Sequence, residues 1–207
     1  MLPNVPEAMG EYPEKRAEAK SLVARDGSAA AIELLVPLCD GKKTYFIRGT
    51  SYHSGNVSQW ETSIAKEISA IQHPKTKEYT WPFLLLDLGE HGFIHFAHHI
   101  GFTSNPMYEA TALMRALVVI RNEMYGNYGR LCPDVSMIVR SHRHHSIAIN
   151  KGKLWAVALP SWQMMTEYAY RVQPERLPEI GFAMIDAGET LKVDIHRFSL
   201  PKPHIER

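Results

Sequence analysis

Histidines at alternate positions follow a short apolar segment, and their types and spacing suit metal chemistry. Residues 134–139 read as a buried strand behind Pro133, and the loop Ser141-His142-Arg143-His144-His145 comes shortly after it. In an extended backbone, residues i and i+2 point to one side and lie roughly 6.5 Å apart. His142 and His144 could therefore bind one metal ion, or two ions about 3.5–4 Å apart in a shared site. The alternative is a polar surface turn that happens to be rich in histidine.

Two further loops that contain histidine begin where predicted strands end. Residues 93–97 form a predicted strand that runs into His98 and His99, and residues 44–48 form one that runs into the loop 49–53, which ends on His53. Open α/β sheets place their ligands outside the ends of their strands. We therefore expect the three histidine-containing loops to converge on one site.

The elements that must position these loops are helices and strands in mixed order. Residues 29–36 read as an apolar helix that stops at Pro37, and Ser58 with Glu61 fits a capping box that opens a helix through Ile71. Asn105 and Pro106 begin another helix. Its expected apolar stripe consists of Met107, Ala110, Met114, Leu117, Val118 and Met124.

Three hairpins complete the expected architecture. They pair residues 82–88 with 93–97, residues 146–149 with 153–159, and residues 181–186 with 190–198. The sequence therefore predicts an α/β fold in which two packed sheets form a sandwich, with helices on the outer face of at least one sheet. We expect one domain over residues 1–207, with residues 1–12 irregular.

Bulk properties exclude several classes of protein. The chain has 207 residues, 45% hydrophobic and 22% charged, as in an ordinary soluble domain. Its formal net charge of +1 gives no support to nucleic-acid binding, although it leaves a nucleic-acid substrate open. No apolar run reaches the roughly 18 residues of a membrane span. With no secretory signal, and with two cysteines that read as reduced thiols, we expect a cytoplasmic protein without a membrane partner.

The three loops, in this order, resemble motifs of the calcineurin-like metallophosphoesterase family, most closely its phage and prophage members. Ser141-His142-Arg143-His144 is similar to the family's GHxH motif, whose two histidines bind different metals. His98, directly after its strand, resembles the preceding single-histidine ligand. Arg48-Gly49-Thr50-Ser51-Tyr52-His53 is similar to RGTxxH, a variant of the family's GNH[D/E] loop.

The resemblance implies a metallophosphoesterase-like αββα sandwich that hydrolyses a phosphate mono- or diester. It also implies divalent metal cofactors, Mn, Zn or Fe, with two ions in a complete site. The residues that it points to are His98, His142, His144 and Thr50 as metal ligands and His53 as the catalytic residue. Arg140 and Arg143 flank the histidines and could bind phosphate oxygens of the substrate in bidentate fashion.

Two motifs of the family are absent from this chain. D-x-H and G-D-x-x-D should precede Gly49, but Asp26 and Asp40 are the only earlier aspartates, and His53 is the first histidine. We therefore expect the C-terminal portion of a phosphoesterase, incomplete at its N-terminus, with an upstream fragment or another polypeptide as the partner that supplies the missing strands. The alternative is a catalytically inactive metal-binding remnant of the same fold. A histidine-rich intracellular protein unrelated to phosphate chemistry is a third reading.

Overall fold

The computed structural model describes residues 28–50, 59–101, 106–128, 134–164, 171 and 177–199. The chain divides into two compact units, Met1–Trp81 and Pro82–Arg207. The expectation of one domain over residues 1–207 stays a prediction. Within the described part of the chain, no helix is both long and apolar enough to cross a lipid bilayer.

The first unit contains short elements around a small apolar cluster. A helix over residues 28–39 is followed by β1 (Phe46–Ile47), α3 (Gln59–Glu67) and β2 (Thr80–Trp81), and β1 pairs with β2 in parallel. Ala65, Ile68 and Ala70 are buried in its core. The expectation that the first helix stops at Pro37 is wrong. The amide of Asp40 donates to the carbonyl of Val36 over 3.1 Å, so helical bonding continues past the proline ring.

The second unit is built on a five-stranded mixed sheet. Its strands are β3 (Phe83–Asp87), β4 (Phe93–Ala97), β5 (Val135–Arg140), β6 (Ile147–Lys151) and β7 (Leu154–Ala158), in the spatial order β3-β4-β5-β7-β6. The strands β4, β5 and β7 run parallel to one another, whereas β3 and β6 are antiparallel edges. The central strand β5 is buried along its whole length, as expected for a strand covered on both faces.

One long helix covers one face of this sheet. The short 3₁₀ helix η4 (Pro106–Tyr108) leads into α4 (Glu109–Tyr128), which connects β4 to β5. Leu113 and Leu117 of α4 are fully buried, and they belong to one core cluster with Ile138 of β5. The expected apolar stripe is therefore partly wrong. Leu117 is buried as predicted, but Met107 is 84% exposed and Val118 is 50% exposed, because the buried face runs through Leu113 instead.

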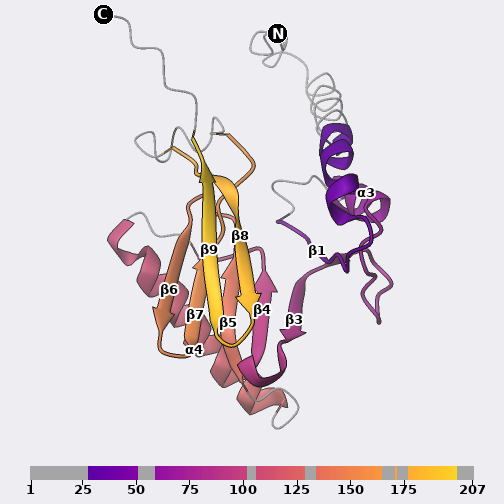
Figure 1. Cartoon of the computed structure of the whole chain (residues 1–207). Helices are drawn as coiled ribbons and strands as arrows, with labels where there is room; N and C mark the ends of the chain where they lie inside the picture. The colour runs from indigo at the N-terminus through magenta and orange to yellow at the C-terminus, as the bar shows by residue number, and fades with distance from the viewer. Residues whose placement is uncertain are drawn as a thin grey trace, which may run out of the picture. The chain divides into compact units, whose positions relative to one another are not determined.

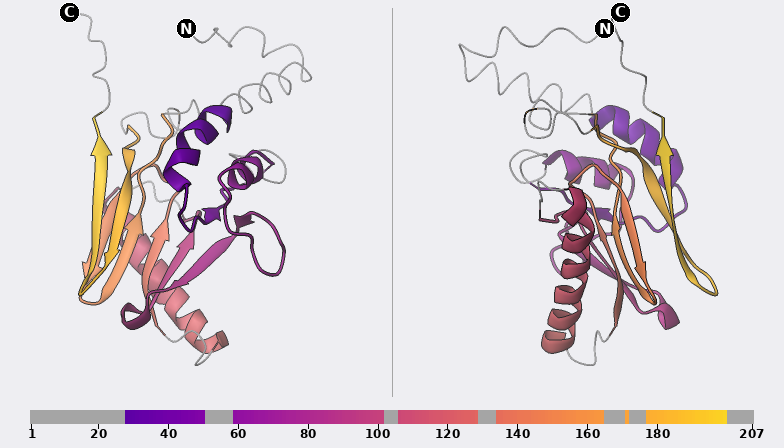
Figure 2. Two further views of the ribbon diagram at one scale, coloured as in Figure 1. Left: turned by 45° about the vertical axis from the view of Figure 1, so that its right-hand side comes forward. Right: turned by 90° about the vertical axis from the view of Figure 1, so that its left-hand side faces the viewer.

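A two-stranded hairpin covers the opposite face. It consists of β8 (Ile180–Ala187) and β9 (Leu191–Phe198), which pair in antiparallel register. Ile185 of β8 and Val193 of β9 pack against a cluster formed by Ile94, Met137, Val139 and Val157 of the five-stranded sheet. Figures 1 and 2 show α4 and the hairpin on opposite sides of this sheet. The second unit therefore has three layers, a helix, a mixed sheet and a hairpin.

The mixed α/β class and all three predicted hairpins are confirmed. The antiparallel pairs β3–β4, β6–β7 and β8–β9 lie where the alternating patterns and turn residues predict them. Those local patterns did not predict the parallel pairs β4–β5 and β5–β7. They place the ends of β4, β5 and β7 along one edge of the sheet, and this edge holds the candidate site.

Candidate functional site

The segments that follow the parallel strands are joined by backbone hydrogen bonds. The amide of Ser141, after β5, donates to the carbonyl of His98, after β4, over 3.0 Å. On the other side of β5, the amide of Leu159 donates to the carbonyl of Arg140 over 2.7 Å. Ala97 of β4 also lies in register with Arg140 of β5. The expectation that histidine-containing strand ends lie together is confirmed for β4 and β5.

Three imidazole rings gather at this edge. The Nε2 atom of His98 lies 3.1 Å from Nδ1 of His142, within hydrogen-bond distance, and their ring centroids are 5.1 Å apart in an edge-to-face arrangement. The ring centroid of His99 is 5.0 Å from that of His142. In this hydrogen bond, one of the two ring nitrogens is the N–H donor and the other is the acceptor. Both nitrogens can bind one metal ion only after that proton has left or has moved to the other nitrogen of its ring.

The backbone of the histidine loop is left-handed at two positions. The φ angle is 72° at His142 and 60° at His144, and residues 142–144 form a bend. The expectation that His142 and His144 alternate along an extended backbone is therefore wrong, because extended residues have negative φ. Side chains other than glycine seldom adopt this conformation, and functional sites are among the places where it persists.

His144 is bonded to the chain through its backbone. Its carbonyl accepts a hydrogen bond of 2.8 Å from the amide of Glu179. Within the described residues, no group of three or more histidine, cysteine, aspartate or glutamate side chains is arranged to hold a metal ion. The described site therefore offers the close pair His98 and His142, and the metal-binding role of His144 stays a prediction.

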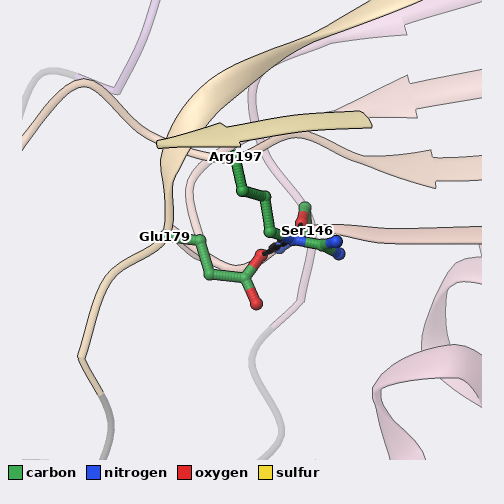
Figure 3. A network of polar contacts seen from close by, with 3 residues as sticks. All are labelled: Ser146, Glu179 and Arg197. Carbon is green, nitrogen blue, oxygen red and sulfur yellow. Dashed lines mark hydrogen bonds and ion pairs between the residues drawn. The ribbon is translucent and has the colours of Figure 1, made fainter. Parts of the chain in front are cut away.

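A polar network attaches the end of the histidine loop to the hairpin (Figure 3). The Oε2 atom of Glu179 accepts hydrogen bonds from the amide of Ser146, over 2.9 Å, and from the hydroxyl of Ser146. The Nε atom of Arg197, in β9, donates to the same Oε2 over 2.9 Å and to the Ser146 hydroxyl over 2.8 Å. Residues on both sides of His145 are thus bonded to Glu179, which lies directly before β8.

This network also changes the acidity of the Glu179 carboxyl group. Its burial by itself raises the pKa, but the hydrogen bonds from Ser146 and the bond and charge of Arg197 outweigh burial, so that the net pKa lies below the usual value. Glu179 is therefore a carboxylate at neutral pH. No local sequence pattern predicts this network, because Glu179 and Arg197 lie 33 and 51 residues from Ser146 along the chain.

A buried arginine lies beneath the histidine loop, at the end of β5. Arg140 is only 4% exposed, and its Nη1 atom donates to the carbonyls of His95, over 2.9 Å, and Val139, over 2.8 Å. Burial lowers the pKa of Arg140 to about 10, so the guanidinium keeps its charge at neutral pH. Arg143, which we also expect to bind substrate, is half-buried in the histidine loop. Phosphate binding by either arginine stays a prediction.

His95, in β4, is a core residue. It is 5% exposed, and its ring stacks on Phe83 with centroids 5.4 Å apart. Burial, and then the positive charge of Arg140, lower its pKa to about 4. The imidazole is therefore neutral at physiological pH. It lies beside the candidate site as part of the sheet and does not belong to the histidine pair.

The structure does not test the two remaining predicted site residues, Thr50 and His53. Thr50 belongs to the first unit, where it is half-buried, whereas His98, His142 and His144 belong to the second. His53 lies outside the described residues. The roles of Thr50 as a ligand and of His53 as a catalytic residue therefore stay predictions.

Comparison with other proteins leaves the family open. No family model matches the chain, and no curated protein matches it either. The resemblance to metallophosphoesterases accordingly rests on the three motifs themselves.

Proposed function

We propose that the edge of the sheet around His98 and His142 is part of the metal site of a phosphoesterase that hydrolyses a phosphate mono- or diester. The observation that carries this proposal is the separation of 3.1 Å between Nε2 of His98 and Nδ1 of His142. Two nitrogen ligands about 2.1 Å from one ion lie about 3.4 Å apart in tetrahedral geometry and about 3.0 Å apart as octahedral neighbours. The observed separation falls between these values, so the pair could share one divalent ion once the proton of its hydrogen bond has left.

The chain's own residues would divide the work as follows. His98 and His142 would bind the ion, and His144 would be a ligand of a second one. The resemblance of the motifs gives Thr50 a metal-binding role and His53 a catalytic role. A divalent ion, Zn, Mn or Fe, would supply electrophilic polarisation of the phosphoryl oxygens. The Arg140 guanidinium, fixed by two carbonyls, adds positive charge near the same edge.

The layered arrangement of the second unit supports this reading. A mixed sheet with a helix on one face and strands on the other is compatible with half of an αββα sandwich. Carboxylates that would complete the site, in the D-x-H and G-D-x-x-D motifs, are absent from the sequence before Gly49. We propose that another polypeptide segment supplies them together with its strands.

A second candidate function is metal binding without turnover. It is favoured by one observation, namely that the described residues hold no group of three or more metal-binding side chains. A catalytic metal site needs three protein ligands and an open position. With two imidazoles alone, the pair would bind a metal weakly and would not activate water.

Metal titration and hydrolysis together test both candidates. We would measure Zn²⁺ and Mn²⁺ binding by calorimetry, and hydrolysis of bis(4-nitrophenyl) phosphate, for the full chain and for its His98→Ala and His142→Ala variants. The matched control is His196→Ala, which removes an exposed imidazole of β9 on the hairpin. If both pair variants lose metal binding and turnover and the control keeps them, the phosphoesterase proposal holds. Metal binding without turnover shows that the chain by itself only binds metal, and it then favours the remnant if added polypeptide that contains D-x-H and G-D-x-x-D restores no turnover. Metal binding unaffected by either pair variant refutes both candidates.

A further inference from the structure

A cavity of about 560 Å³ lies beside the histidine pair, on the face of the sheet that α4 covers. One wall consists of Tyr108, at the end of η4, and of the first part of α4 up to Ile120. The segment His99–Gly101, which follows β4, forms another wall, and Arg140 at the end of β5 completes the lining. Its volume lies within the range of about 300–1,000 Å³ that is usual for small-molecule sites.

The lining is apolar along most of its length and positively charged at defined points. Ile100, Ala112, Ala116, Val119 and Ile120 provide an apolar surface. Its positively charged lining residues are Arg115 and Arg140. A cavity of this composition suits a ligand with a compact apolar body and an anionic group.

Arg140 provides the strongest reason to expect an anion. It is 96% buried, since 4% of its surface is exposed, and its recorded partners are the carbonyls of His95 and Val139. Within the described part of the chain, no carboxylate forms an ion pair with it. A buried charge is costly unless it is paired. Since Arg140 lines the cavity, a ligand bound there can supply the missing negative charge.

The cavity also adjoins the candidate metal site. His99 lines the cavity, and the centroid of its ring is 5.0 Å from that of His142. A ligand whose anionic group approaches Arg140 would therefore lie next to the histidine loop. Its apolar body would extend along α4, away from the strand ends.

We propose that this cavity binds an amphipathic anion, with a compact aromatic or branched aliphatic body and a phosphoryl or carboxylate group. The anionic group contacts Arg140 and Arg115, and the body packs against the apolar surface of α4. That this ligand is the substrate, a phosphoester of a small apolar alcohol or phenol, rests on the proposed function. The binding itself does not.

Calorimetric titration with phenylphosphonate tests the proposal on the full chain. Its P–C bond resists hydrolysis and EDTA removes metals, so a lack of phosphoesterase activity does not affect the result. We expect saturable binding to one site. Replacement of Arg140 would leave the carbonyls of His95 and Val139 without their donor, and the fold could fail for that reason alone. The test therefore uses variants at exposed positions.

Two neighbouring valines of α4 form a matched pair. Val119 is 48% exposed and lines the cavity, whereas Val118 is 50% exposed and does not. Val119→Trp should weaken phenylphosphonate binding at least about tenfold because the indole occupies the cavity, while Val118→Trp should leave it within about twofold. Arg115→Gln should weaken binding about tenfold, and Lys153→Gln, the same change of charge in the exposed β6–β7 turn, should not.

Three further titrations distinguish the ligand classes. Benzoate should also bind, and the tighter of benzoate and phenylphosphonate identifies the anionic group. Inorganic phosphate and benzyl alcohol should each bind at least about tenfold more weakly than phenylphosphonate. Phosphate lacks the apolar body, and benzyl alcohol lacks the anionic group. The proposal is overturned if phosphate or benzyl alcohol binds as tightly as phenylphosphonate. Equal weakening by Val118→Trp and Val119→Trp, or no binding by wild type, overturns it as well.

Discussion

The buried imidazole of His95 should make the stability of the second unit depend on pH. Replacement by phenylalanine removes the titrating group and keeps an aromatic ring against Phe83. The carbonyl of His95 that accepts from Arg140 belongs to the backbone and remains in the variant. The ring nitrogen Nδ1 is buried without a hydrogen-bond partner within the described residues, so phenylalanine sacrifices no bond there.

The expected magnitude follows from the lowered pKa of His95. In the folded state the pKa is about 4, against 6.5 for an ordinary histidine. A difference of about 2.5 units corresponds to about 3 kcal/mol. Because the folded pKa lies below the unfolded one, the unfolded chain takes up the proton first. The associated stability is complete above pH 6.5 and is lost as the pH falls towards 4.

Urea denaturation followed by circular dichroism, at several pH values between 4 and 8, measures this effect. We expect the free energy of unfolding of wild type to fall by about 3 kcal/mol more than that of His95→Phe between pH 7 and pH 4. Leu85→Ala is the control, because Leu85 is the cross-strand partner of His95 and does not titrate. It should lower stability equally at every pH. If His95→Phe and wild type lose stability in parallel, the buried imidazole is not held neutral and the reasoning fails.

Three further variants test the interactions that hold the second unit together. Glu179→Gln should cost about 1 kcal/mol at neutral pH, after allowance for solvent screening, and should speed hydrogen exchange of the Ser146 amide. Since the pKa of Glu179 is lowered on folding, this cost should be complete above the ordinary pKa of a glutamate and should disappear as the pH falls through the lowered pKa of the folded state. Gly92→Ala should cost more than about 2 kcal/mol in urea denaturation, because φ is 78° and the new Cβ would lie 2.5 Å from the carbonyl oxygen of Asp134. Leu117→Ala should cost about 2–5 kcal/mol in the same assay, because the side chain is fully buried.

Each of these variants has a matched control. Glu189→Gln removes the same charge at an exposed position of the β8–β9 turn and should not change exchange at Ser146. Gly89→Ala has a similar φ of 63° but no atom within 4 Å of the new Cβ, so it should cost less than Gly92→Ala. Val118→Ala truncates a half-exposed residue of α4 and should cost under about 1 kcal/mol. If a control variant changes the measured stability or exchange rate as much as its partner variant does, the contact that explains the partner variant is contradicted.

The hairpins were predictable because their signals are local. Turn residues such as Asn150-Lys151-Gly152 lie between apolar runs, and the two strands of a hairpin are neighbours in sequence. The stripe of α4 was less predictable, since apolar residues occur on several sides of that helix. Leu113 and Leu117 are buried whereas Val118 is half-exposed, because the packing of α4 on β5 and β7 determines which side of the helix is covered. The periodicity of apolar residues alone does not show which side of α4 is buried.

The candidate site was predictable only in part for the same reason. The sequence predicted that His98 and His142 follow strand ends. The parallel pairing of β4 and β5 then brings Nε2 of His98 to 3.1 Å from Nδ1 of His142. The bend at the histidine loop left no trace in the residue types, because left-handed turns usually contain glycine or asparagine. Glu179 and Arg197 come from distant positions, and only the packing of the hairpin brings them to Ser146.

The left-handed backbone at His142 and His144 implies a conflict between two kinds of selection. A side chain in this conformation costs about 1–2 kcal/mol relative to glycine, so selection for folding alone favours glycine or asparagine at both positions. A library randomised at residues 142 and 144 and sorted by protease resistance should therefore accumulate these two residues. The same library sorted for metal binding should retain histidine at 142. If the two sorts select different residues, histidine at position 142 lowers the stability of the fold and is needed for metal binding.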